Sequence, residues 1–166
     1  MKQLSILLAV FMGLNSNLRA ESSKKIVSDI IVNTSLQNAW ALWTTEEGVK
    51  SWLHIDAAVI EPRFGGAYEL YFAPDHSDNN TKDCKILTYE PFRKLVFQWK
   101  GPSSLAVMND QPLPTRVEVQ FESLEKNKTR LHFQNIGYGE GTEWESAYNW
   151  FTRAWFGAFE DLKNTH

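Results

Sequence analysis

Cysteine is almost absent from this chain, since its 166 residues contain only Cys84. One thiol cannot form an internal disulfide, and a structural zinc site built from several cysteines is excluded. The fold must therefore be held by packing alone. We interpret Cys84 as a small, buried, apolar residue.

Clusters of positive charge are also missing. The net charge is −3, and the lysines and arginines are spread along the chain. A surface that binds nucleic acid needs a clustered basic excess, so we expect no nucleic-acid partner. The sequence has no internal repeat, low-complexity tract or interdomain linker, and no nucleotide-binding or nucleophile-elbow motif. Its length fits one domain with a sizeable core.

No apolar run reaches the roughly 20 residues that a helix needs to cross a bilayer. The run from Ile6 to Leu14 follows the cationic Lys2 and precedes Leu18-Arg19-Ala20. This order predicts a secretory signal peptide over residues 1–20, cut after Ala20. We therefore expect one secreted or periplasmic domain, residues 21–166, without a stable membrane span. The alternative is an N-terminal helix that frays or stays in the membrane.

Aromatic residues, by contrast, are abundant at 13%, and seven of them are tryptophans. Alternating polar and apolar residues predict a series of strands, the clearest of which put Leu95, Phe97 and Trp99 on one face. His132 falls on the opposite face, which indicates an antiparallel sheet with one wet side. Between the first strand and the others, capping signals at Thr34 and at Thr45 predict two short helices. The predicted strands are 24–32, 54–60, 67–72, 84–89, 94–99, 115–124 and 128–136.

The segment from Thr142 to Lys163 predicts a long C-terminal helix with one apolar stripe. Glu145, three residues after Thr142, suggests a capping box at its start. We expect the stripe to face the dry side of the sheet. Its members are Trp144, Ala147, Tyr148, Phe151, Trp155, Ala158, Phe159 and Leu162.

The order strand, two short helices, strands and long helix resembles the family related to the activator of heat-shock-protein-90 ATPase. Five phrases carry the resemblance: "VNTSLQNAWALWTTEEGVKSWL", "EPRFGGAYEL", "YEPFRKLVFQW", "TRVEVQFESLEKNKTRLHFQNIG" and "AWFGAFEDLK". Cys84 and Ala154 stand where the family usually has glycine, and the loop 101–114 looks long. The resemblance implies an α+β helix-grip fold within the START and birch-pollen-allergen-like (SRPBCC) superfamily, with a curved antiparallel sheet around the last helix.

The same resemblance implies a cavity between the sheet and the last helix. Loop 102–114 follows the strand that ends at Trp99 and carries apolar side chains, so we expect it to be the lid. An apolar lining with a few polar tips suits a small hydrophobic or aromatic ligand. The alternative is a solid core that happens to be aromatic. The expected ligand-binding residues are Trp52, Tyr68, Leu70, Phe97, Trp99, Tyr148, Phe151 and Trp155.

Positive signs of catalysis are few. The four histidines have no metal-ligand spacing, and only His54 is placed near a possible cavity mouth. We therefore expect no metal or cofactor, and we assign no catalytic residue. The leading hypothesis is an exported protein that binds a small hydrophobic molecule. The alternatives are a cyclase- or hydrolase-type enzyme, and a protein-interaction module that exposes Trp150, Phe156 and the loop from Leu105 to Leu113.

Overall fold

The computed structural model describes residues 24–74, 81–109 and 111–166. The predicted signal peptide lies outside these residues. In the part of the chain that is described, none of the helices has the length and apolar character needed to cross a membrane. The elements are β1 (Ile26–Val32), α1 (Leu36–Thr44), α2 (Glu46–Lys50), β2 (Ala57–Ile60), β3 (Tyr68–Tyr71), β4 (Ile86–Glu90), β5 (Lys94–Trp99), η1 (Ser103–Met108), β6 (Thr115–Glu125), β7 (Lys128–Ile136) and α3 (Thr142–Thr165).

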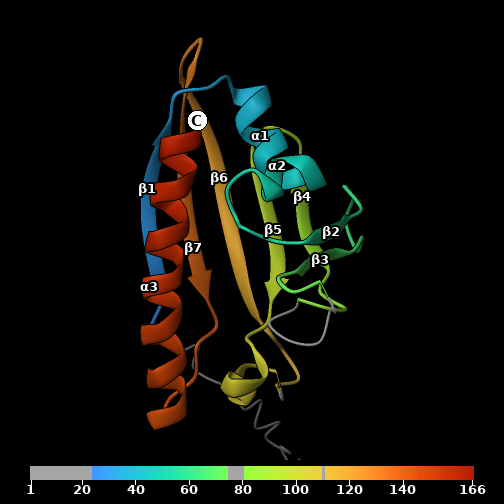
Figure 1. Cartoon of the computed structure of the whole chain (residues 1–166), viewed down its shortest axis with the longest axis vertical. Coiled ribbons are helices and arrows are strands. Elements are labelled where there is room, and N and C mark those ends of the chain that lie inside the picture. Colours follow the sequence, from blue (N-terminus) through green and yellow to red (C-terminus); the bar gives the residue numbers. More distant parts are fainter. Residues whose placement is uncertain (1–23, 75–80, 110) are drawn as a thin grey trace, which may run out of the picture.

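Five strands form one antiparallel sheet in the order β1-β7-β6-β5-β4 (Figure 1). The hairpin of β6 and β7 turns between Glu125 and Lys128, where the sequence predicted it. Strands β2 and β3 pair separately. An isolated bridge between Ala67 and Lys85 links this smaller sheet to the chain just before β4. The sheet predicted as one piece therefore consists of a main sheet and a linked hairpin.

All the helices lie on one side of the main sheet. In Figure 1, α3 runs alongside β1 and β7, while α1 and α2 lie toward β4 and β5. Strand alternation decides which side is covered, because successive side chains point to opposite faces. Val117 and Val119 are fully buried beneath the helices, whereas Glu118 and Gln120 point outward and are at least partly exposed. The predicted sheet with one dry and one wet face is confirmed.

The helix caps agree only in part with the predicted ones. Thr45 caps α2, with its hydroxyl accepting a hydrogen bond from the Gly48 N–H at 3.0 Å. The cap of α1 is Ser35, one residue after the predicted Thr34, and its hydroxyl accepts from Asn38 N–H. The predicted capping box of α3 is wrong. Gly141 occupies the cap position at φ 106°, which favours glycine, and no side chain caps the helix.

The predicted apolar stripe of α3 is confirmed. Six of its members are buried, and the other two, Tyr148 and Ala158, are half-buried against the same core. Outside the stripe, Trp150 and Phe156 are 40% and 47% exposed. The 24-residue helix therefore presents one continuous aromatic face to the sheet.

Candidate ligand site between helix and sheet

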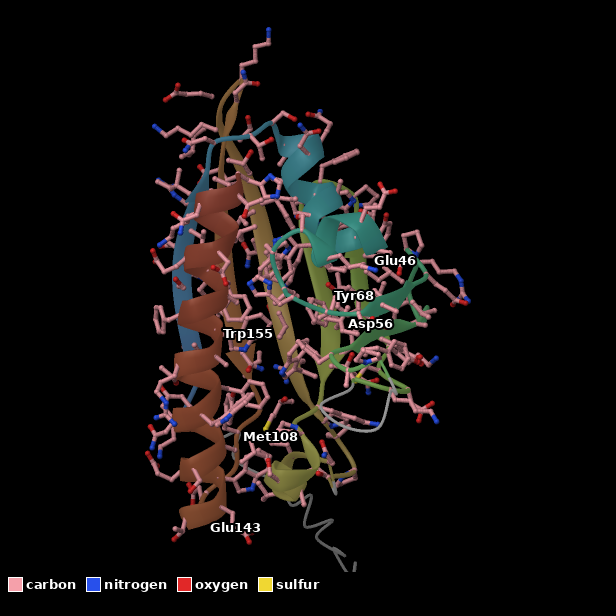
Figure 2. The ribbon with its side chains drawn as sticks, in the orientation of Figure 1. Glu46, Asp56, Tyr68, Met108, Glu143 and Trp155 are labelled. Atoms are coloured by element: carbon pink, nitrogen blue, oxygen red, sulfur yellow. The ribbon has the colours of Figure 1, made fainter. Side chains whose placement is uncertain are left out.

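The structure gathers the eight predicted site residues into one hydrophobic core. Seven of them are buried, and Tyr148 is half-buried at the edge. Trp155 reaches from α3 toward the sheet, and Tyr68, the first residue of β3, lies on the far side of the interior (Figure 2). The structure therefore brings these residues together, and their role in binding a ligand stays a prediction.

The rings of these residues are in contact with one another. The Tyr68 and Phe97 rings stack with centroids 3.8 Å apart, and Phe97 meets Trp99 edge-on at 6.0 Å. Trp99 in turn lies 4.8 Å from Trp155 and 6.2 Å from Phe151. A line of packed aromatic rings therefore runs from β3 across β5 to α3. Contacts of this kind contribute about 0.5–1.5 kcal/mol each beyond the area that they bury.

Most polar tips in this interior have partners within the protein. The Tyr68 hydroxyl donates to Trp43 O at 2.9 Å, and Trp52 Nε1 donates to Leu42 O at 3.0 Å. The Tyr148 hydroxyl donates to Lys25 O at 3.5 Å. These side chains fasten α1 and the segment before β1 to the core, and they need no ligand to satisfy them.

Asn135 of β7 is a key interior residue that the predicted site omitted. It is fully buried, and its Oδ1 accepts from the Tyr138 hydroxyl at 2.6 Å and from Trp155 Nε1 at 3.2 Å. Its amide nitrogen donates to Arg116 O at 3.0 Å. Strand alternation held the signal, because Asn135 shares the inward phase of Phe133. A polar residue at an inward position implies a buried network.

Two buried indoles differ from the rest. Trp99 Nε1 and Trp43 Nε1 have no hydrogen-bond partner among the described residues. Trp99 is 4% exposed and Trp43 is fully buried, so neither nitrogen reaches bulk water easily. Leaving a buried donor unpaired costs about 1–3 kcal/mol. Of the eight predicted site residues, Trp99 alone keeps such a donor.

One end of the interior is covered by the short segment η1. Met108 is its fully buried residue, and Figure 2 shows the side chain pointing from η1 toward the space between α3 and the sheet. Leu105 and Val107 pack against the same core and are half-buried. The backbone leaves helical geometry at Leu105, with φ −115° and ψ 48°. The predicted lid is therefore in contact with the interior through its apolar side chains.

The groups considered for catalysis are poorly placed for it. Burial raises the pKa of the Tyr68 and Tyr138 hydroxyls well above the ordinary value, so both stay protonated. The His54 side chain is 84% exposed and lies 3.2 Å from Asp161 near the end of α3, outside the interior. No group of three or more metal-ligating side chains occurs among the described residues.

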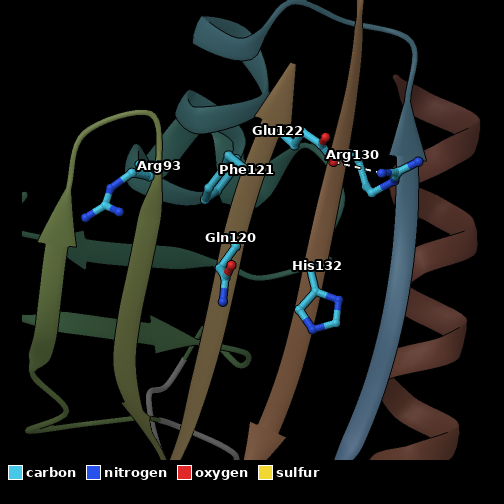
Figure 3. A pocket seen from close by; sticks show the side chains of 6 residues that line it. All are labelled: Arg93, Gln120, Phe121, Glu122, Arg130 and His132. Atoms are coloured by element: carbon cyan, nitrogen blue, oxygen red, sulfur yellow. Dashed lines mark hydrogen bonds and ion pairs between the residues drawn. The ribbon is translucent and has the colours of Figure 1, made fainter. Parts of the chain in front are cut away.

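A separate pocket of about 220 Å³ lies on the opposite, outer face of the sheet (Figure 3). Several of its polar side chains are paired with neighbours: Arg130 pairs with Glu122 at 2.8 Å, and His132 Nδ1 lies 2.7 Å from Asp29. The lining combines both charge signs in an open setting, which is typical of a solvated sheet face. The pocket is lined by Arg93, Gln120, Phe121, Glu122, Arg130 and His132.

An antiparallel sheet packed against a long C-terminal helix, with two short helices after the first strand, defines a helix-grip domain of the SRPBCC superfamily. The chain belongs to the Activator of Hsp90 ATPase homolog 1-like family, whose family model matches residues 33–166. A search of the curated proteins gave no match.

Solved structures support the fold. A Nitrosomonas europaea protein has a TM-score of 0.65 at 13% identity, covering 87% of this chain and 95% of its own. The Aha1 dimer of Colwellia psychrerythraea has a TM-score of 0.54 at 19% identity, and the match covers 85% of this chain and 94% of that one. An Hsp90 activator of Plasmodium falciparum has a TM-score of 0.57 at 18% identity, and the match covers 78% of this chain and 88% of that one. At these identities the likeness shows the shared fold alone.

Proposed function

We propose that this protein binds a small hydrophobic or aromatic molecule between α3 and the sheet, beneath η1. The observation that carries the proposal is the contrast between the aromatic interior and its cover. Trp99 and Phe151 belong to a wall formed by regular elements, whereas the cover is one short segment with a backbone kink at Leu105. Segments with few regular hydrogen bonds open at low free energy.

The ligand would enter by displacing the Met108 side chain. Met108 is unbranched and buried, so it can adopt other rotamers as a guest arrives. Gly101 and Asn109 sit at the two ends of the segment, and the Asn109 side chain bonds both Gly101 N–H at 3.0 Å and Gly101 O at 2.9 Å. These two bonds hold the two ends of the segment together.

The test is a titration of the purified protein with fluorene, followed by tryptophan emission. We expect saturable quenching in the wild type. Met108→Trp should block binding by filling the entry, at an overpacking cost of about 1–3 kcal/mol. Leu113→Trp is the matched control in the same loop, because Leu113 is 83% exposed and its replacement should leave binding unchanged.

Met108→Ala provides the opposite change. It shortens the buried side chain, so fluorene should bind more tightly although the fold loses about 2–5 kcal/mol. A folded wild type and a folded Met108→Ala variant that both fail to bind fluorene would show a solid core and end the proposal.

We also propose that residues 1–20 direct export, on the basis of their sequence pattern. The expected N-terminus of the secreted or envelope fraction is at or near Glu21. Recovery of the uncut chain from the cytosol would contradict export. It would also make a cytosolic protein partner, of the kind that the family's name describes, a candidate again.

A protein-interaction role is favoured by one observation, the exposed apolar side chains. Trp150, Phe156 and Leu113 are 40%, 47% and 83% exposed. The predicted patch is smaller than expected, however, because Leu105 and Val107 pack against the core. Six residues along a helix correspond to about 120° of rotation, so Trp150 and Phe156 do not share one face of α3. This role becomes the leading one only if the interior binds no probe.

A further inference from the structure

We infer that the ligand is a neutral, largely aromatic molecule bearing an exposed hydrogen-bond acceptor such as a ketone oxygen, and that Trp99 Nε1 donates to it. This inference rests on the proposed function, since it specifies the chemistry of the same site. It starts from the hydrogen-bonding inventory of the interior, in which the unpaired aromatic groups are donors.

Most buried tyrosines and indoles of the interior have an acceptor within the protein. Tyr68, Tyr138 and Trp155 all donate to protein oxygens. Their acceptors are a main-chain carbonyl and the Asn135 amide oxygen, and Asn135 already accepts two bonds. Trp99 Nε1 has no acceptor among the described residues, and the residue is only 4% exposed to solvent. A guest that supplies an oxygen would therefore recover a hydrogen bond that the protein does not make.

The position of Trp99 favours it over Trp43 as the donor. Trp99 contacts Phe151 and Trp155 of α3. It is the last residue of β5, and η1 begins four residues later. A β-carbon added at Gly101 would lie 3.1 Å from Met108 Sδ, so the Met108 side chain lies close to the chain just after β5. Trp43 instead belongs to α1, which lies at the other end of the sheet from η1 (Figure 1), and its ring packs between those of Trp52 and Phe133.

The charge of the ligand follows from the buried polar residues. The described ones are four threonines and one asparagine, and they carry no charge. An ionised group would lose its hydration in this interior without gaining a counter-ion, which is strongly unfavourable. Flat aromatic guests suit the surrounding rings, which prefer offset-stacked and edge-to-face contacts.

The experiment compares 9-fluorenone with fluorene, two molecules of nearly the same shape that differ in the ketone oxygen. Calorimetric titration of the wild type should show fluorenone binding about 5- to 10-fold more tightly, the ratio expected for one neutral hydrogen bond. Trp99→Phe keeps a ring but removes the N–H, so the ratio should fall to about 1. Trp43→Phe is the matched control, since it removes the other unpaired indole and should keep the ratio.

The outcomes separate the two hypotheses. If neither molecule binds the folded wild type or the folded Met108→Ala variant, the proposed function fails. Equal binding of both by the wild type overturns the acceptor inference but leaves the function standing, and the indole N–H then faces only ring surfaces. Loss of the preference in Trp43→Phe rather than in Trp99→Phe overturns the assignment of the donor.

A second measurement needs no folded variant. In the wild type labelled with ¹⁵N, the indole N–H resonance of Trp99 should move downfield with fluorenone and move far less with fluorene. Equal movement with both probes would contradict a hydrogen bond to the ketone. Fluorene-9-carboxylate tests the charge, and binding as tight as that of fluorenone would overturn the neutral class.

Discussion

Polar groups on the two faces of the main sheet find hydrogen-bond partners in different ways. On the outer face, Glu118 pairs with Lys94 at 3.0 Å and with Arg116 at 3.6 Å, and a similar pair joins Glu122 to Arg130. These groups also meet water. On the inner face, the residues of the same strands are mostly aromatic or aliphatic, with Thr115, Thr129 and Asn135 as buried polar exceptions. Each polar atom there must find a protein partner or stay unpaired.

The difference teaches where a specific ligand can gain free energy. A guest on the outer face would have to compete with water and with existing ion pairs, each contributing only about 0.2–1 kcal/mol. A guest on the inner face meets rings and the Trp99 N–H, which has no acceptor among the described residues. The site should therefore be sought on the inner face, even though the outer pocket is more open.

The largest effect should come from Trp155→Ala on the inner face. Trp155 contacts Trp99, Phe133 and Phe159, so its truncation leaves a large cavity in the core. We expect a loss of about 3–5 kcal/mol in urea unfolding. Phe156→Ala, one position along the helix at a 47% exposed site, should cost less than about 1 kcal/mol. Similar losses for the two variants would contradict the assigned stripe.

Asn135→Ala should have the next largest effect. The change leaves the Tyr138 hydroxyl and Trp155 Nε1 without their common acceptor in a buried site. We expect a loss of about 2–4 kcal/mol, measured by urea unfolding. Gln134→Ala is its control on the outer face of β7, and it should cost under about 1 kcal/mol. A small loss for Asn135→Ala would mean that water reaches these donors.

Alkaline pH should then reveal the buried thiol. Burial raises the pKa of Cys84 from 9.0 to about 12. Between these values the unfolded chain releases the proton while the folded chain keeps it, so the free energy of unfolding falls as pH rises. From about pH 9 to pH 10 the wild type should lose stability faster than Cys84→Ala, because the tyrosines, whose ordinary pKa is near 10, titrate alike in both chains. Parallel curves would place the thiol in contact with solvent.

The smallest effect should come from the outer ion pair of Glu122 and Arg130. Both side chains are well exposed, so a double-mutant cycle of Glu122→Ala and Arg130→Ala should give a coupling below about 1 kcal/mol. The coupling should shrink further in 1 M salt, where exposed charges are screened. A coupling above 2 kcal/mol would show that the outer face contributes to stability as the inner face does.

Several details could not be predicted from local patterns. The cap of α1 shifted by one residue because Thr34 and Ser35 can both cap a helix, and tertiary contacts choose between them. Thr34 instead uses its main-chain oxygen to accept from the buried Thr129 hydroxyl at 3.0 Å. At α3, Gly141 takes the cap position because the chain must turn with positive φ after β7.

The sequence by itself determined the family, the order of the elements and the sorting of side chains between faces. These features follow from local periodicity and from phrases that survive in order along the chain. It also determined which residues meet, because a helical stripe and alternating strand faces leave one way to bury them. Only the tertiary structure decided how their polar atoms pair. Whether an indole finds an acceptor depends on distances of a few tenths of an ångström between distant segments. Asn135 became an acceptor for Trp155 and Tyr138, while Trp99 kept its unpaired N–H.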